Sequence, residues 1–330
     1  MRPIHYAESH VPLYQLPDPL RLADGTPVSA PTDWHARRRP ELLDLFADHI
    51  YGRTPDLAPA THVRRHEQTA VRTYGDATRT QVTIEWEQNG AACHVDLLIY
   101  LPAATRPAPC FMGLNFHGNH TTQDDTAIRL PTASWPEDDA DASHRRHVAE
   151  ELRGSQRSRW PLAQILGRGY GLITAYCGDL TPDVPDGLAH GVGQLPTAHP
   201  WQERPGNGWG AVGRWAWGLS RILDYCAVDP AIDETRVALM GHSRLGKTAL
   251  WAGAQDARFA LVISNNSGCA GAALSRRCFG ETVAAITTRF PHWFCPTFHT
   301  YADREAALPV DQHELLSLIA PRPLYVASAT

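Results

Sequence analysis

The first clear pattern of hydrophobic and polar positions is a pair of strand-like segments at residues 81–86 and 93–100. Apolar side chains recur there at close to every second position, the period of a strand with one buried face. Asn89-Gly90 lies between the two segments, and this dipeptide favours the two-residue turn of a β-hairpin. We therefore predict an antiparallel pair of strands early in the folded region.

Short apolar runs, typical of buried strands, then alternate with longer segments of helical character. The predicted strands lie at residues 110–116, 169–176, 236–240, 259–264 and 323–328. The predicted helices lie at residues 37–50, 160–166, 211–228, 248–254 and 311–319. A hairpin followed by strands alternating with helices indicates an α/β fold, in which a mostly parallel sheet carries helices on both faces.

The division of the chain follows from the same pattern. Residues 1–35 are rich in proline and polar side chains, and we expect an arm lying over the rest of the protein. Residues 36–330 show neither repeats nor a second domain, so we expect a single α/β domain. Residues 267–310, with tryptophan, phenylalanine and glycine, are predicted to be an insertion that shapes a pocket.

Composition narrows the possible partners. The chain has 330 residues, of which 43% are hydrophobic and 20% charged, with a net charge of −5. This balance argues against nucleic acid or an anionic membrane as partner, and we expect a monomer. No stretch is apolar enough to cross a bilayer, and the first residues lack the core of a signal peptide. We expect a cytoplasmic protein, or a secreted or periplasmic one if a leader has been removed.

The seven cysteines are odd in number and irregular in spacing. Without a C-x-x-C pair they predict no zinc site, and we expect neither a metal nor a cofactor. Most are expected to be small buried hydrophobic residues, while one disulfide among Cys269, Cys278 and Cys295 stays open.

The chemistry is concentrated in the heptapeptide Gly-His-Ser-Arg-Leu-Gly-Lys at residues 241–247, between a predicted strand and a predicted helix. A serine in a glycine-flanked turn of this kind is typical of the nucleophile elbow of α/β-hydrolases, although an ordinary Gly/Ser turn is the alternative. Lys247 is the only lysine among the 30 basic residues. It lies one helical turn after Ser243, so both side chains are predicted to share one face.

This heptapeptide resembles the G-C/H-S-R-x-G-K signature of the glucuronoyl esterases, carbohydrate esterase family fifteen. Four further segments resemble the bacterial branch of that family, and the resemblance extends from about residue 45 to residue 330. They are residues 266–271, 280–282, 290–294 and 308–313.

The resemblance implies a serine esterase that cleaves 4-O-methyl-glucuronoyl esters linking xylan to lignin alcohols in plant cell walls. It implies that Ser243 is the nucleophile, that Arg244 helps hold the oxyanion, and that Lys247 and Glu281 bind sugar hydroxyls. Trp293 could stack on a sugar or lignin ring, or could be a buried core residue. An acetyl-xylan or other carbohydrate esterase, and an inactive sugar-binding homologue, are the alternatives.

The remaining members of a serine triad are harder to place. The acid and then the histidine usually follow the last strands of this fold, and Thr330 comes directly after the strand predicted at 323–328. The family's other acid position is occupied here by Asn266. None of His292, His299 and His313 follows a strand in the required order. We therefore expect the acid and the histidine beyond Thr330, and little activity from residues 1–330 alone.

The predicted strand at 110–116 ends in His117-Gly118-Asn119-His120. In α/β-hydrolases, the loop at this place supplies a second N–H group to the oxyanion. The tetrapeptide is a weaker version of the usual glycine-rich sequence, so a purely structural loop is the alternative.

Overall fold

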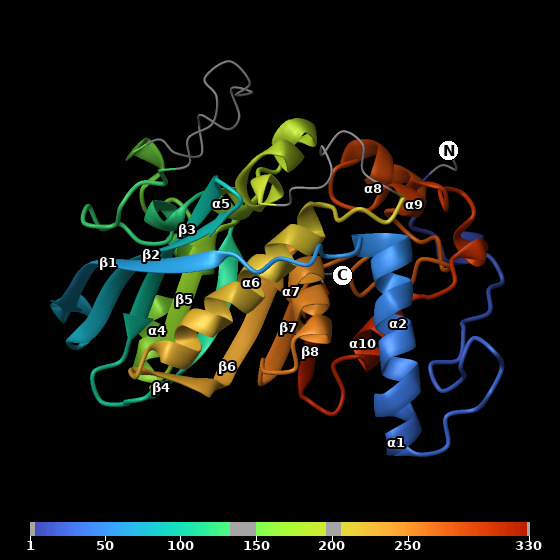
Figure 1. The fold of residues 1–330 in the computed structure, drawn as a ribbon, viewed down its shortest axis with the longest axis horizontal. Helices are drawn as coiled ribbons and strands as arrows, with labels where there is room; N and C mark the ends of the chain where they lie inside the picture. Colours follow the sequence, from blue (N-terminus) through green and yellow to red (C-terminus); the bar gives the residue numbers. More distant parts are fainter. Residues whose placement is uncertain (1–3, 133–149, 196–205, 329–330) are drawn as a thin grey trace.

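The computed structural model describes residues 4–132, 150–195 and 206–328. Its centre is a mixed sheet of eight strands in the order β1-β2-β3-β5-β4-β6-β7-β8 (Figure 1). The strands are β1 (Ala60–Val71), β2 (Ala77–Gln88), β3 (Ala91–Leu101), β4 (Ala108–Asn115), β5 (Gly171–Tyr176), β6 (Ile232–His242), β7 (Leu261–Asn265) and β8 (Leu324–Ala327).

The predicted hairpin is confirmed by the pairing of β2 with β3. Asn89 and Gly90 have φ values of 56° and 82°, the left-handed conformation that a tight hairpin turn requires. Strand β1, which pairs antiparallel with β2, was not predicted. Its side chains are mostly exposed, so its sequence lacks the apolar alternation from which a strand is recognised.

The predicted parallel strands are also confirmed. β5, β4, β6, β7 and β8 run parallel to their neighbours in that order. The carboxyl ends of parallel strands meet at one edge of the sheet, and there His242 of β6 lies opposite Asn265 of β7. This edge is where open α/β sheets place their ligands, so the strand order fixes the position of the site.

The five predicted helices are confirmed with errors at their ends, whereas the helices at residues 177–180, 283–289 and 296–299 were not predicted. The longer ones are α2 (Arg39–Phe46), α4 (Leu162–Gly167), α6 (Ala211–Val228), α7 (Arg244–Gln255), α8 (Val283–Arg289) and α10 (Gln312–Ser317). Helix α2 is the middle of a helical segment that starts with α1 (Pro31–Asp33) and ends at Tyr51. Two short helices, α5 (Cys177–Leu180) and α9 (Pro296–His299), flank segments that contribute residues to the site.

Two layers of packing hold the sheet. On one face, α6 and α7 cover the sheet and bury large side chains such as Trp215 and Trp251 (Figure 1). A second, smaller cluster includes Leu162 and Leu166 of α4. Each fully buried side chain of this size contributes roughly 1.5–3 kcal/mol of hydrophobic stabilisation. At the β8 end of the sheet the side chain of Tyr325 is 60% exposed.

The N-terminal residues contact the other end of the chain. The carbonyl of His5 accepts a hydrogen bond from the Gly280 N–H, and that of Pro17 contacts His313 Nε2. Arg38 forms a buried ion pair of 2.6 Å with Glu314 at the start of α10. Residues almost three hundred positions apart are therefore held together.

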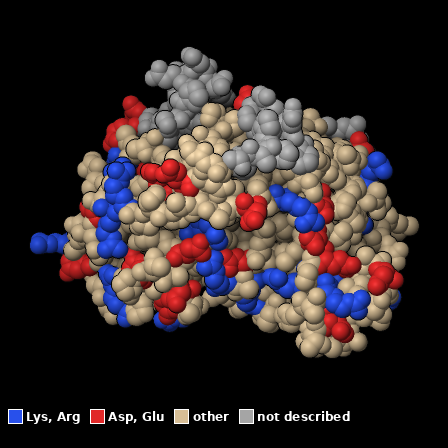
Figure 2. Space-filling view, in the orientation of Figure 1, with Lys and Arg blue, Asp and Glu red and all other residues tan. Residues whose placement is uncertain are grey.

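Other expectations concern the cysteines and the surface. All seven cysteines are buried, as predicted for small hydrophobic side chains, and none forms a disulfide, so the disulfide left open is not present. Acidic and basic side chains are interspersed over the face in Figure 2. Among the described residues, no helix is long and apolar enough to cross a membrane.

Candidate active site

Ser243 occupies the sharp turn between β6 and α7. Its φ and ψ of 55° and −126° lie in a region that residues other than glycine rarely adopt. Gly241 and Gly246 make this turn possible. A methyl group at Gly241 would clash with the backbone carbonyl of Leu245, and one at Gly246 would approach the Ser267 side chain to 3.0 Å. The glycines expected from the heptapeptide are thus required by packing.

The backbone around Ser243 leaves hydrogen-bond donors at the start of α7. The Ser243 N–H donates to the Asn265 carbonyl, which ties the turn to β7. The N–H groups of Gly246 and Lys247 both donate to the Ser243 carbonyl. Those of Arg244 and Leu245 precede the first intrahelical bonds and lie at the positive end of the helix dipole, where a developing oxyanion would be stabilised.

The guanidinium of Arg244 is held on several sides. Its central carbon lies 4.4 Å from the centre of the Phe116 ring and 5.9 Å from that of Trp293. Arg244 Nε lies 2.7 Å from Oδ2 of Asp183, an ion pair without the alignment of a linear hydrogen bond. A residue predicted to act on the oxyanion is therefore fixed by partners from three other segments.

Asp183 follows α5 and is a site residue that sequence reasoning missed. Its Oδ1 accepts hydrogen bonds from His292 Nε2 at 2.9 Å and from Trp293 Nε1 at 2.5 Å. Burial alone would raise the pKa of Asp183, but these two hydrogen bonds and the charge of Arg244 hold that pKa below its usual value. Asp183 is therefore a carboxylate at neutral pH, and His292 carries a proton on Nε2.

Lys247 lies within the protein one turn after Ser243, with only 3% of its surface exposed. Its Nζ donates to the carbonyl of Ser267. Burial lowers the pKa of Lys247, and the negative charge of Glu281 opposes that shift. A methyl group added to Gly268 would lie 3.9 Å from Lys247 Nζ and 3.8 Å from Glu281 Oε2, so both charged groups border the same small space.

Trp293 is placed in the core of the insertion. It is 4% exposed, and its ring stacks on Phe290 with 3.8 Å between ring centres. The structure thus shows a buried tryptophan, and stacking of Trp293 on a sugar or lignin ring stays a prediction.

The three histidines downstream of Ser243 have other partners. His292 Nε2 bonds to Asp183, His299 Nε2 to the Pro291 carbonyl, and His313 Nε2 to the Pro17 carbonyl. The loop after β4 is likewise engaged, because the Gly118 N–H donates to the Asn115 side chain at 2.8 Å. That N–H is therefore not free for an oxyanion.

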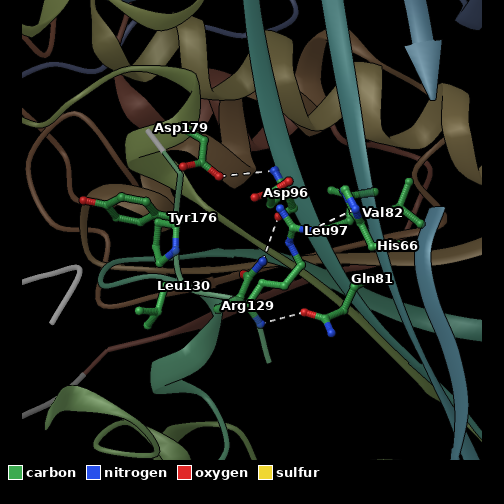
Figure 3. Close-up of a pocket in the computed structure, with 11 residues that line it drawn as sticks. His66, Gln81, Val82, Asp96, Leu97, Arg129, Leu130, Tyr176 and Asp179 are labelled. Atoms are coloured by element: carbon green, nitrogen blue, oxygen red, sulfur yellow. Dashed lines mark hydrogen bonds between the residues drawn. The ribbon is translucent and has the colours of Figure 1, made fainter. Parts of the chain in front are cut away.

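Two cavities border this region. One, of about 480 Å³, lies at the carboxyl ends of β4, β6 and β7 and includes His242, the neighbour of Ser243. The other, of about 10 Å³, lies further along the sheet beside α5 (Figure 3). Figure 3 shows the Asp179 carboxyl directed at the backbone of Asp96, with Arg129 and Gln81 bordering the same space.

A serine on a strained turn between a central parallel strand and a helix, with a cation beside it, is the arrangement of an α/β-hydrolase. Comparisons with known proteins give the family. The family description "Glucuronyl esterase, fungi" matches residues 205–330. The carbohydrate esterase MZ0003, from an unknown prokaryotic organism, is 47% identical over the whole chain, which spans 76% of that relative.

Solved structures agree with the sequence comparison. A promiscuous CE15 esterase from a marine bacterial metagenome is 44% identical with a TM-score of 0.88, over 99% of this chain and 82% of the other. The glucuronoyl esterase from Solibacter usitatus is 43% identical with a TM-score of 0.86, over 96% and 80%. The chain belongs to carbohydrate esterase family 15, the glucuronoyl esterases.

Proposed function

We propose that this protein hydrolyses glucuronoyl esters, with 4-O-methyl-glucuronate esters of lignin alcohols on xylan as its natural substrate class. The observation that carries the proposal is the buried ammonium of Lys247, one turn from Ser243 and bordering the same space as Glu281. A sugar presents vicinal hydroxyls, which can accept from an ammonium and donate to a carboxylate at once. An acetyl ester offers no such group on its acyl side.

In this mechanism Ser243 Oγ attacks the ester carbonyl and the alcohol leaves. The negative charge that develops on the carbonyl oxygen is stabilised by the N–H groups at the start of α7 and by the Arg244 guanidinium. Lys247 and Glu281 bind the sugar hydroxyls, so the carbonyl carbon is held near the nucleophile. Water then releases the glucuronate from Ser243.

The attacking hydroxyl also needs a general base. Among the described residues no histidine hydrogen bonds to the Ser243 hydroxyl, and the Nε2 atoms of His292, His299 and His313 bond to Asp183, Pro291 and Pro17, so we expect this chain to turn over slowly. Loss of the base from a serine triad costs about 10⁶ in kcat, and the oxyanion site leaves about 10³ to 10⁴ over water. Added imidazole should then raise the rate, and it should have no effect on Ser243→Ala.

The test of the proposal compares a benzyl ester of glucuronate with a benzyl acetate of the same leaving group. Preference for the glucuronate ester by about tenfold or more in kcat/KM, lost in Glu281→Gln, is expected. Equal use of the two esters would favour an acetyl-xylan or other carbohydrate esterase.

A second candidate is a sugar-binding homologue without catalysis. It is favoured by Asn266, an amide at the family's acid position, together with the engaged histidines. Labelling of Ser243 by a fluorophosphonate separates the two, because only an activated serine reacts quickly. A chain that binds glucuronate but is not labelled, with or without imidazole, would be the binding protein.

A further inference from the structure

We infer that Asp183 is a positioning residue, which fixes the guanidinium of Arg244 beside the nucleophile; this rests on the proposed function. Asp183 reaches the site from the carboxyl end of β5, after α5, whereas Arg244 is the first residue of α7 after β6. His292 and Trp293 come from the insertion between α8 and α9. The carboxylate is the point where these three segments meet.

Both oxygens of Asp183 are used. Oδ2 pairs with Arg244 Nε at 2.7 Å, and Oδ1 accepts from His292 Nε2 and Trp293 Nε1. The side chains of Asp183 and His292 are 17% and 4% exposed, so water competes little for these contacts. With three partners on two oxygens, the carboxylate has one orientation, and it imposes that orientation on the guanidinium.

The ion pair with Asp183 involves Nε of Arg244 and does not involve its two terminal NH₂ groups. Within the described residues, no hydrogen bond or ion pair of the protein occupies them, and the ring of Phe116 restricts the guanidinium from one face. Donors held in place before the reaction stabilise a transition state without reorganising. Without this carboxylate, the Arg244 guanidinium would have to be ordered during each turnover. This ordering would raise the barrier of the chemical step, so kcat would fall while KM would change little.

The first test is Asp183→Asn, which keeps the size of the side chain and removes its charge. We expect kcat on the glucuronate benzyl ester to fall about tenfold to a hundredfold, with KM within about threefold. Asp125→Asn is the matched control, because Asp125 also pairs with a buried arginine, Arg79 on β2, which three strands separate from β6. Its kcat should be unchanged at equal folded fraction.

A double-mutant cycle with Arg244→Gln decides whether Asp183 acts through the arginine. The fall in kcat caused by Asp183→Asn should shrink to less than about threefold when Arg244 is already replaced. A full loss in that background would overturn the inference, as would a kcat for Asp183→Asn equal to that of the parent chain.

A readout without turnover keeps the inference separate from the proposed function. The NMR signal of the Arg244 Nε–H group, assigned by its absence in Arg244→Gln, should show an ordered side chain with a high order parameter, which should fall in Asp183→Asn. An unchanged order parameter would refute the positioning role even if the protein were no esterase. Absent turnover with a high order parameter that falls in Asp183→Asn would refute the proposed activity and leave the positioning of Arg244 by Asp183 established.

Discussion

Asp179, four residues before Asp183, should make a contribution to the pH dependence of stability that destabilises the folded protein as the pH rises. Its side chain is buried in α5, where Oδ2 accepts from the Asp96 N–H at 3.2 Å. Oδ1 is buried and has no hydrogen-bond partner among the described residues. Burial, followed by the charge of Asp96, raises the pKa of Asp179 well above the usual 3.8. The folded protein therefore retains a proton that the unfolded chain releases.

The difference in proton binding between the folded and unfolded states sets the sign and the size of the effect of Asp179 on the free energy of unfolding. Above about pH 4 the unfolded chain has lost its proton and the folded protein has not, so each further pH unit stabilises the unfolded state by about 1.4 kcal/mol. This loss continues up to the pKa of Asp179 in the folded protein. Asp179→Asn cannot ionise, so its free energy of unfolding should gain about 1.4 kcal/mol relative to the parent chain between pH 5 and pH 6.

Urea unfolding followed by tryptophan fluorescence at pH 5, 5.5 and 6 measures this gain. The exposed carboxylate of Asp186 offers a matched control, and Asp186→Asn should retain the pH dependence of the parent chain. A difference between Asp179→Asn and the parent that does not change with pH would refute the reasoning. It would mean that the folded protein holds Asp179 as a carboxylate, compensated by a positive group such as Arg129 across the small cavity.

Two further predictions concern the site. Lys247→Met removes the buried ammonium at similar size. Transition-state stabilisation for glucuronate esters should fall by about 1.5–3 kcal/mol, roughly tenfold or more in kcat/KM, while the free energy of unfolding stays equal or rises. An unchanged kcat/KM would show that the lysine does not touch substrate. Gly241→Ala places a methyl group against the Leu245 carbonyl and should lower the free energy of unfolding by about 1–3 kcal/mol or more, which a thermal melt detects as a lower Tm. A Tm within a degree of the parent would contradict the packing described for the turn.

The sequence predicts those parts of the structure that depend on near neighbours. Asn89-Gly90 identifies the hairpin because its turn is local, and Gly241 and Ser243 identify the elbow because strand, turn and helix are consecutive. Strand β1 is not predictable in this way, since its exposed side chains show no alternation. Its position is set by pairing with β2.

The missed site residue has a similar explanation. Asp183 lies in a proline-rich loop, where an aspartate has no distinguishing pattern. It becomes important only because the order of β5, β4 and β6 in the sheet brings that loop to Arg244. Trp293 and His292 are likewise assigned to the carboxylate by three-dimensional contact rather than by sequence.

The ion pair between Arg38 and Glu314 has a consequence for how the chain folds during synthesis. The two residues are 276 positions apart, so the helix that carries Arg38 cannot complete its contacts until almost the whole described chain has left the ribosome. Until then the apolar side chains of α2, Leu42 and Phe46, lack part of their final packing. The N-terminal helix is made among the first elements and gains its last contacts only when the chain is nearly complete, so its apolar face is exposed in the interval.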